Sequence, residues 1–394
     1  MTATVWDQVV GHADAVRTLR ESLDADRVAH AWLFTGPVGV GKVEVARVFA
    51  AALNCELGPG SGADGTCNAC RRVLRGVYPD VHLVEPEGEN LLVEDVRGLR
   101  EEAWRSRQEG RTAVFIVDQA DRMTEAGANA LLKVLEEPPA GVVFILVARS
   151  ANSLVDTIPS RARTVSFTDL PLDALAEGLA AAHGVEPDRA AWAAAAGHGR
   201  LDRARELLTD SGARDRRERV LNLIETLATG MPGDAMAAAA TVVAVGEDAS
   251  NAAKLRHAAE LEEYERTFGK GRGSGTMRKR IETRHRRALR RVRFEAIREA
   301  VVDLISGYRD IIWTAGAGEG EVRLIHTDRR AMTERLAARV GLAGAMAAAG
   351  ALEEADRRLT IGAAPLLACE ASFLAANAAL RGARMPLARV DLRR

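Results

Sequence analysis

A glycine-rich loop between an apolar run and a helical run limits most strongly how this 394-residue chain can fold. The loop is Gly36–Val43 (GPVGVGKV), and it directly follows the apolar run Ala31–Thr35 (AWLFT). In such a strand–loop–helix unit, glycines let backbone N–H groups close around phosphate oxygens. The helix start adds positive potential, and Lys42 adds a charge. A glycine turn that arose by chance is the alternative, and the strand–loop–helix context disfavours it.

Apolar runs and amphipathic stretches alternate over residues 1–170. Besides Ala31–Thr35, the runs typical of buried strands are Val81–Glu85, Thr112–Val117 and Val142–Val147. The amphipathic stretches between them are Val43–Leu53, Val93–Arg107 and Thr124–Glu136. This alternation predicts a parallel sheet with helices on both faces.

Beyond Leu170 the pattern becomes helical and stays so to the end of the chain. Three short helical stretches would suit a small lid, and longer ones follow from about residue 213. We therefore expect an α/β domain over residues 1–170, a small helical lid over 171–212 and an all-α domain over 213–394. The segment Gly269–Gly275 (GKGRGSG) predicts a flexible break within the last of these.

Charge and hydropathy exclude some classes of protein. The formal net charge of −1 argues against a generic polyanion-binding protein, so any nucleic-acid contact must come from a local patch. The amino terminus lacks the pattern of a secretory signal, and no run approaches the ~20 apolar residues that cross a bilayer. We expect a cytoplasmic protein without a membrane partner.

One basic stretch, Arg278–Arg298, carries ten Lys/Arg residues against two Glu and has helical periodicity. It could lie near DNA phosphates or against an acidic surface of another subunit. Equally, it could be the solvated face of a long helix, neutralised by the acidic residues around Glu260–Glu265. The sequence leaves both possibilities open.

Three of the four cysteines, Cys55, Cys67 and Cys70, fall within sixteen positions. In a reducing cytosol such a cluster indicates metal binding rather than disulfides. Cys369 stands alone in an alanine-rich helical context, which favours an inert core thiol.

Two longer segments carry a resemblance to a known family. Ala29–Lys42 (AHAWLFTGPVGVGK) and Asp121–Pro139 (DRMTEAGANALLKVLEEPP) strongly resemble the clamp-loader branch of AAA+ proteins. The resemblance covers roughly the first 210 residues well. It implies an AAA+ P-loop domain, a helical lid and a helical collar that joins five subunits in a ring. The implied partners are other clamp-loader subunits, and the sliding clamp and primer–template DNA would be reached through that assembly.

The catalytic positions depart from an active member of that family. Val43 stands where the phosphate-loop pattern has the Ser or Thr hydroxyl that coordinates Mg²⁺. Asp118 ends the apolar strand that would hold Mg²⁺ through water, but Gln119 follows it where active members have a catalytic Glu. We expect ATP and Mg²⁺ binding to be weak or absent and the chain itself to lack ATPase activity. Gly36, Gly39, Gly41 and Lys42 remain as a degenerate nucleotide site.

The resemblance also gives Arg161 a role. Pro159–Ala162 (PSRA) stands where the family has an S-R-C motif, whose Arg touches ATP bound by a neighbouring subunit. Ala162 departs from the usual Cys, and the alternative is an arginine that is merely ion-paired on a loop. Two further departures are VARS after Leu146 and Asp202, which stands where an active lid offers Arg.

For the cysteines, the family has a small zinc module with the spacing C-x8-C-x2-C-x2-C. Cys55, Cys67 and Cys70 keep three of the four places, and the remaining place falls on Asp64. Three thiolates and one carboxylate can bind a structural Zn²⁺. The alternative is a degenerate module over residues 55–70 that holds no metal.

Three functions agree with at least part of this sequence pattern. A degenerate clamp-loader subunit that lends Arg161 to a neighbour agrees best with the sequence. An active motor ATPase of the same family is the alternative, and Val43 and Gln119 argue against it. A stand-alone zinc-containing DNA-binding protein disagrees with the near-zero net charge and with the AAA+ pattern.

Overall fold

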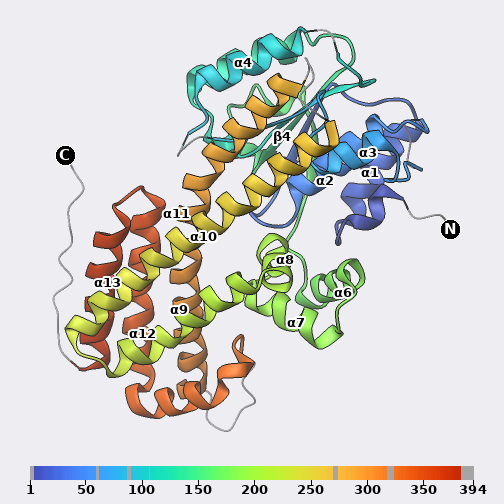
Figure 1. The fold of residues 1–394 in the computed structure, drawn as a ribbon. Helices are drawn as coiled ribbons and strands as arrows, with labels where there is room; N and C mark the ends of the chain where they lie inside the picture. The colour runs from blue at the N-terminus through green and yellow to red at the C-terminus, as the bar shows by residue number, and fades with distance from the viewer. Residues whose placement is uncertain are drawn as a thin grey trace. The chain divides into compact units, whose positions relative to one another are not determined.

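The computed structural model describes residues 4–58, 62–86, 90–105, 107–268, 274–316 and 324–382. The chain divides into two compact units (Figure 1). Unit 1 comprises Met1–Thr209 with Glu260–Arg287, and unit 2 comprises Asp210–Ala259 with Ala288–Arg394. The predicted flexible segment Gly269–Gly275 lies mostly outside the described residues, between helices that end at Phe268 and begin at Ser274.

Unit 1 is built on a five-stranded parallel sheet in the order β2-β3-β4-β1-β5. The strands are β1 (Ala31–Thr35), β2 (Val81–Val84), β3 (Ala113–Val117), β4 (Val142–Ala148) and β5 (Arg163–Ser166). The helices up to the sheet's last strand are η1 (Val5–Gln8), α1 (Ala13–Asp24), α2 (Lys42–Leu53), α3 (Asn68–Leu74), α4 (Val93–Ala103), η2 (Ala120–Arg122), α5 (Glu125–Glu136), η3 (Ala151–Ser153) and η4 (Pro159–Arg161). The predicted parallel sheet with flanking helices is confirmed.

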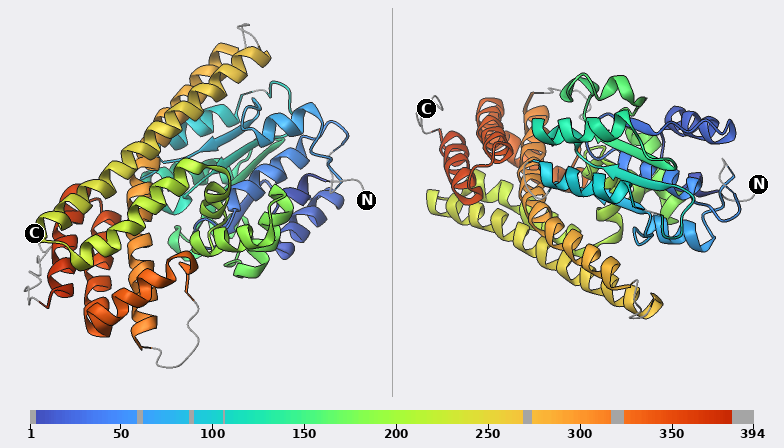
Figure 2. Two further views of the ribbon diagram at one scale, coloured as in Figure 1. Left: turned by 60° about the horizontal axis from the view of Figure 1, so that its bottom comes forward. Right: turned by 90° about the horizontal axis from the view of Figure 1, so that it is seen from above.

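Both faces of the sheet are covered by helices, as the views in Figure 2 show. Alternate residues of a strand point to opposite faces. In β1, Trp32 and Phe34 therefore join a core with α1, α2 and α3. Leu33, between them, joins the core on the other face with α4 and α5. This two-sided burial explains why the central strands are continuous apolar runs rather than alternating ones.

Three short helices complete the described part of unit 1 that precedes residue 210. They are α6 (Leu172–His183), α7 (Pro187–Ala196) and α8 (Leu201–Thr209). Leu175 and Leu179 of α6 pack with Ala193 of α7 and Leu208 of α8 in a small core of their own. Val10 and Leu170 also pack in this core. Val10 precedes β1 in the chain and Leu170 follows β5, so the core connects the three helices to both ends of the segment that forms the sheet.

Unit 2 is helical throughout its described residues. Its elements are α9 (Ser211–Thr229), α10 (Pro232–Phe268), α11 (Ser274–Gly316), η5 (Thr327–Arg329), α12 (Arg330–Thr360) and α13 (Pro365–Leu380), with α10 and α11 passing partly into unit 1. Its core surrounds the buried side chains of Tyr308 and Phe373 and is rich in alanine. The Tyr308 hydroxyl donates to Ile224 O at 3.1 Å, and Asn377 Nδ2 donates to Leu227 O at 2.9 Å.

One segment among the described residues departs from the prediction that no part of the chain could cross a membrane. Thr327–Thr360 is long and apolar enough by length and mean hydropathy, with a value of 1.3 over its best window. A core helix passes the same test, and Leu352 and Leu359 of this stretch are buried in unit 2. Non-helical backbone at Gly341 also interrupts it.

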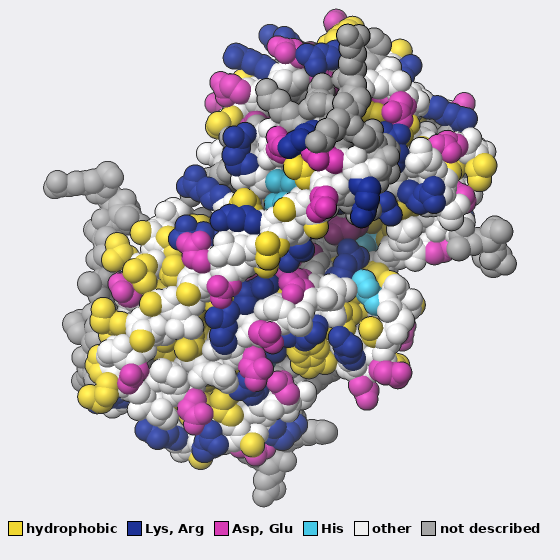
Figure 3. Space-filling model, viewed as in Figure 1, with side chains coloured by type: hydrophobic (Ala, Val, Ile, Leu, Met, Phe, Trp, Pro, Cys, Tyr) yellow, Lys and Arg dark blue, Asp and Glu magenta, His cyan; other side chains and the backbone are white. Residues whose placement is uncertain are grey.

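The basic stretch lies on α11, and several of its arginines are paired within the chain. Arg278 contacts Glu265 and Glu282, while Arg293 contacts Glu247 at 2.9 Å. Basic and acidic side chains are interspersed on the face shown in Figure 3. Intrachain pairing thus supports the solvated-face interpretation of this stretch.

Candidate functional site

The phosphate-loop residues lie between the carboxyl end of β1 and the start of α2. Gly39 and Gly41 have φ angles of +81° and +98°, a region that side chains other than glycine rarely adopt. Gly36 begins the loop, and Lys42 is the first residue of α2. The backbone therefore has the conformation of a loop that could cradle an anion.

The Lys42 side chain is turned back onto the loop. It is buried, and its Nζ donates to Gly36 O at 2.6 Å and also to Pro37 O. Burial lowers the pKa of Lys42 from its usual value, and nearby carboxylates, of which Asp118 has the largest effect, oppose that shift. The other three carboxylates are Asp121, Glu44 and Asp202. The Lys42 amine is thus hydrogen-bonded to carbonyl oxygens of its own loop and is influenced by carboxylates of the same chain.

Neither the Val43 nor the Gln119 side chain can serve as the Mg²⁺ ligand or the catalytic base that an active member of the resembled family has at these positions. Val43 is half-buried and packs against the core that contains α2. Asp118 follows β3, and its Oδ1 accepts from the backbone N–H of Gln119 at 2.9 Å. The Gln119 amide nitrogen lies 3.5 Å from Asp118 Oδ2, so this side chain is directed toward Asp118. An amide at this place can orient a group but cannot take a proton.

The start of α8 contacts the phosphate loop directly. The Leu201 N–H donates to Gly39 O at 2.8 Å. Arg200 and Asp202 form a two-pronged ion pair, with nitrogen–oxygen distances of 3.0 and 2.7 Å. A Cβ atom on Gly39 would lie 2.6 Å from Arg200 Nε and 2.8 Å from Asp202 Oδ1, so this pair lies against the loop. Arg203, which follows Asp202, is buried.

His12 also contacts this loop, and this contact was not predicted from the sequence. Its Nε2 lies 2.7 Å from Val40 O, and its ring packs edge-on against Phe167 at 4.9 Å. Burial is the main cause that lowers the pKa of His12, and the Lys42 charge acts in the same direction. No local pattern in the sequence signals this contact, because His12 precedes the loop by a whole helix and strand.

Arg161 lies near the amino ends of the strands, whereas the phosphate loop of its own chain lies at their carboxyl ends. It ends η4, just before β5, and the β5 residue Arg163 is in register with Trp32 of β1. Because the strands are parallel, Arg161 is at the amino ends and Gly36 at the carboxyl ends. Its guanidinium lies 2.9 Å from Glu136, another contact that the sequence analysis missed.

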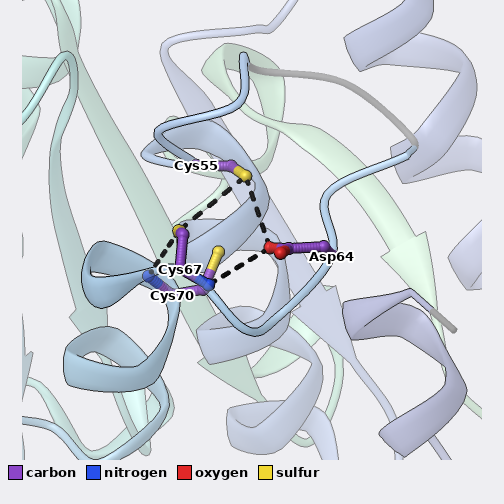
Figure 4. A group of neighbouring side chains, drawn as sticks. All are labelled: Cys55, Asp64, Cys67 and Cys70. Atoms are coloured by element: carbon purple, nitrogen blue, oxygen red, sulfur yellow. Dashed lines mark hydrogen bonds between the residues drawn. The ribbon is translucent and has the colours of Figure 1, made fainter.

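The four predicted metal ligands converge in the structure (Figure 4). Their candidate ligand atoms, the sulfurs of Cys55, Cys67 and Cys70 and an oxygen of Asp64, all lie within 4.8 Å of one another. The Cys55 sulfur is 4.0 Å from the Cys67 sulfur and 3.9 Å from Asp64 Oδ1. Ligands at ~2.0–2.3 Å from a tetrahedral Zn²⁺ are separated by similar distances, so the donor set fits such an ion.

Local structure explains how the cluster is held. Cys55 follows α2, while Cys67 caps the start of α3, its sulfur accepting from the Cys70 N–H at 3.4 Å. The Asp64 carboxylate accepts from the Thr66 hydroxyl and backbone N–H, and these bonds lower the Asp64 pKa. Burial raises the pKa of the Cys70 thiol, so metal binding would have to displace its proton.

Comparisons with known proteins give the following matches. A sequence model for the family described as "DNA polymerase III, delta subunit" matches residues 11–171. The chain is 39% identical over 165 residues to DNA polymerase III subunit gamma/tau of Mycobacterium tuberculosis (strain ATCC 25618 / H37Rv), covering 42% of this chain and 28% of that protein. It is 35% identical over 164 residues to DNA polymerase III subunit delta' of Bacillus subtilis (strain 168), covering 42% of this chain and 50% of that protein.

The matches thus span half the length or less of these curated relatives. A solved structure of a DNA polymerase III gamma subunit-related protein from Thermotoga maritima covers 93% of this chain and 100% of that one. The TM-score is 0.43 at 17% identity, and this likeness implies nothing about function.

Proposed function

This chain belongs to the DNA polymerase III clamp-loader family through residues 11–171, and we propose that it is a subunit of the delta-prime type. In this proposal it is a catalytically degenerate AAA+ subunit that assembles with motor subunits. It supplies Arg161 in trans for the ATP-driven loading of the sliding clamp onto primed DNA during replication. It does not hydrolyse ATP itself.

The observation that carries the proposal is the loss of two catalytic groups from one site. The Val43 side chain offers no hydroxyl oxygen to Mg²⁺, and the Gln119 side chain offers no base to an attacking water. Either loss alone would impair hydrolysis. Together they remove both the metal ligand and the residue that activates water, while Asp118 and the loop glycines remain.

Two contacts of the pocket agree with weak nucleotide binding. The Lys42 ammonium already donates to Gly36 O and Pro37 O, so binding a phosphate would require it to break these bonds. The loop is also bonded to the lid through Leu201 and lies against the Arg200–Asp202 pair. The Arg200 guanidinium that lies against the loop is already paired with Asp202, so binding a polyphosphate would require it to leave this carboxylate.

Arg161 supports the role in trans by its position. The sheet separates it from its own phosphate loop by at least the length of a strand, about 13 Å for four residues. A phosphate that meets this guanidinium would therefore belong to another subunit. Such an arginine stabilises the charge that develops during phosphoryl transfer.

The proposed partners are gamma/tau-type motor subunits and a delta-type subunit. Residues 1–170 would form the AAA+ domain, 171–212 its lid and 213–394 the collar that joins the ring. The sliding clamp and primer–template DNA would be reached through the assembly, in the cytoplasm. Cys55, Asp64, Cys67 and Cys70 would hold one structural Zn²⁺, since a closed four-ligand site leaves no position for catalysis.

An active gamma/tau-type ATPase is the second candidate. It is favoured by the 39% identity to a gamma/tau subunit and by the retained Gly36, Gly39, Gly41 and Lys42. The two candidates differ in one measurable property, which is ATP turnover that depends on Lys42.

ATPase assays of the isolated protein and of a reconstituted complex distinguish the two candidate functions. The chain should co-purify with gamma/tau-type and delta-type subunits of its own organism and should show no ATP turnover alone. ATP turnover of roughly 1 s⁻¹ or faster, abolished by Lys42→Ala, would show instead that the chain is an active motor ATPase.

A further inference from the structure

The Arg161 guanidinium is held from two sides. Within its own loop, Nη1 donates to Thr157 O at 3.1 Å and to Ser160 Oγ at 3.2 Å. From α5, Glu136 places its Oε1 2.9 Å from Nη2. The N–H on Nε and the second N–H on Nη2 are not needed for these contacts and can meet a further acceptor.

The carboxylate that holds Arg161 comes from a well-anchored element. Glu136 is the last residue of α5, a helix capped at its start by Thr124, whose Oγ1 accepts from Gly127 N at 3.2 Å. Leu131 and Leu135 bury one face of α5 against the sheet. Pro138 prevents the helix from continuing. Glu136 therefore extends from a fixed helix end rather than from a loop.

This contact contributes little to folding. The two side chains remain 36% and 51% exposed, and exposed ion pairs contribute about 0–1 kcal/mol. Its consequence is geometric, because it restricts the directions in which a long side chain can point. Donors that are fixed before the reaction need no reorganisation when charge develops in the transition state.

We propose that Glu136 is a positioning residue for Arg161. It holds the guanidinium in the orientation in which the remaining N–H groups meet the phosphates of a nucleotide bound by the neighbouring subunit. Glu136 touches no nucleotide and acts only through Arg161. This inference rests on the proposed role of Arg161 in trans.

The test uses the reconstituted clamp-loader complex, in which only the motor subunit that faces Arg161 keeps an intact phosphate loop. DNA- and clamp-stimulated ATPase is measured for Glu136→Gln, Glu136→Asp and Arg161→Ala at matched assembly. The control is Glu137→Gln, since Glu137 is the adjacent exposed carboxylate and has no ion pair among the described residues. Glu136→Gln should lower kcat by about threefold to tenfold with KM unchanged. Glu136→Asp should recover part of the loss, and Glu137→Gln should match wild type.

The double variant separates positioning from other roles. If Glu136 acts through Arg161, adding Glu136→Gln to Arg161→Ala should cause no further loss. An unchanged or raised kcat in Glu136→Gln, beside a clear loss in Arg161→Ala, overturns the positioning role and leaves the finger intact. An unchanged kcat in Arg161→Ala overturns the proposed role in trans itself. Equal thermal stability of all variants excludes a folding defect as the cause.

Discussion

The backbone N–H of Leu201 donates to the carbonyl oxygen of Gly39 at 2.8 Å, so the lid helix α8 is bonded to the loop that would bind phosphate. In an ATPase, these two elements are expected to respond to nucleotide. In this chain the loop and α8 are hydrogen-bonded to each other. The bond engages a carbonyl oxygen of the loop and holds the loop against α8, and it leaves aside the N–H groups from which a phosphate would accept.

Replacing Gly39 by Ala should destabilise unit 1 by about 1–3 kcal/mol. The new Cβ would meet Arg200 and Asp202, and the backbone φ of +81° would be strained. Chemical unfolding of Gly39→Ala and of the wild-type protein, followed by circular dichroism, measures the change.

The matched control is Gly98→Ala, in the middle of α4. A Cβ there meets nothing within 4 Å, so this variant should gain about 0.5–1 kcal/mol. Equal effects of the two substitutions would contradict both the left-handed backbone at Gly39 and its contact with the Arg200–Asp202 pair.

Protein purified without chelator should contain about one zinc ion per chain, because four converging ligands close a structural site. Cys67→Ser should lose the metal and lower the melting temperature. Asp64→Cys should retain it and bind more tightly, since a fourth thiolate replaces a carboxylate. Elemental analysis measures the metal in each variant.

Cys369→Ala is the control for the metal, since Cys369 is buried in the core of unit 2 and is not part of the candidate metal-binding group found among the described residues. It should keep the full metal content. A wild-type protein that is fully folded and free of metal would contradict the zinc prediction.

Arg161→Lys should recover little of the activity that Arg161→Ala removes from the complex. An ammonium cannot reproduce a planar guanidinium that contacts Glu136, Ser160 and a phosphate at once. Stimulated ATPase and the rate of clamp loading measure the effect. Full recovery by Lys would show that only the charge matters and would remove the geometric argument.

The central strands could be predicted from sequence because both of their faces are buried. Val142–Val147 was expected and β4 is Val142–Ala148, a difference of one residue. The edge strand β5 was not predicted, since only Val165 of Arg163–Ser166 is buried and no apolar run marks it. The helix expected over Val93–Arg107 ends at Ala103.

The site was predictable only where its residues are close in sequence. The loop glycines and Lys42 form one continuous motif, whereas the cysteine cluster needed the family spacing to include Asp64. The Leu201–Gly39 and Glu136–Arg161 contacts join segments that are distant in the chain. Such contacts depend on tertiary packing, and neither residue type nor spacing signals them.

The most direct test of the account compares Lys42→Ala with Arg161→Ala in reconstituted complex at matched assembly. Lys42→Ala should leave stimulated ATPase and clamp loading at the wild-type level, because this chain's own pocket performs no hydrolysis. Arg161→Ala should lower both, with a partial loss because the other ATP sites keep their own arginines. The reverse pattern, in which Lys42→Ala lowers turnover and Arg161→Ala does not, would contradict the account and identify the chain as a motor subunit.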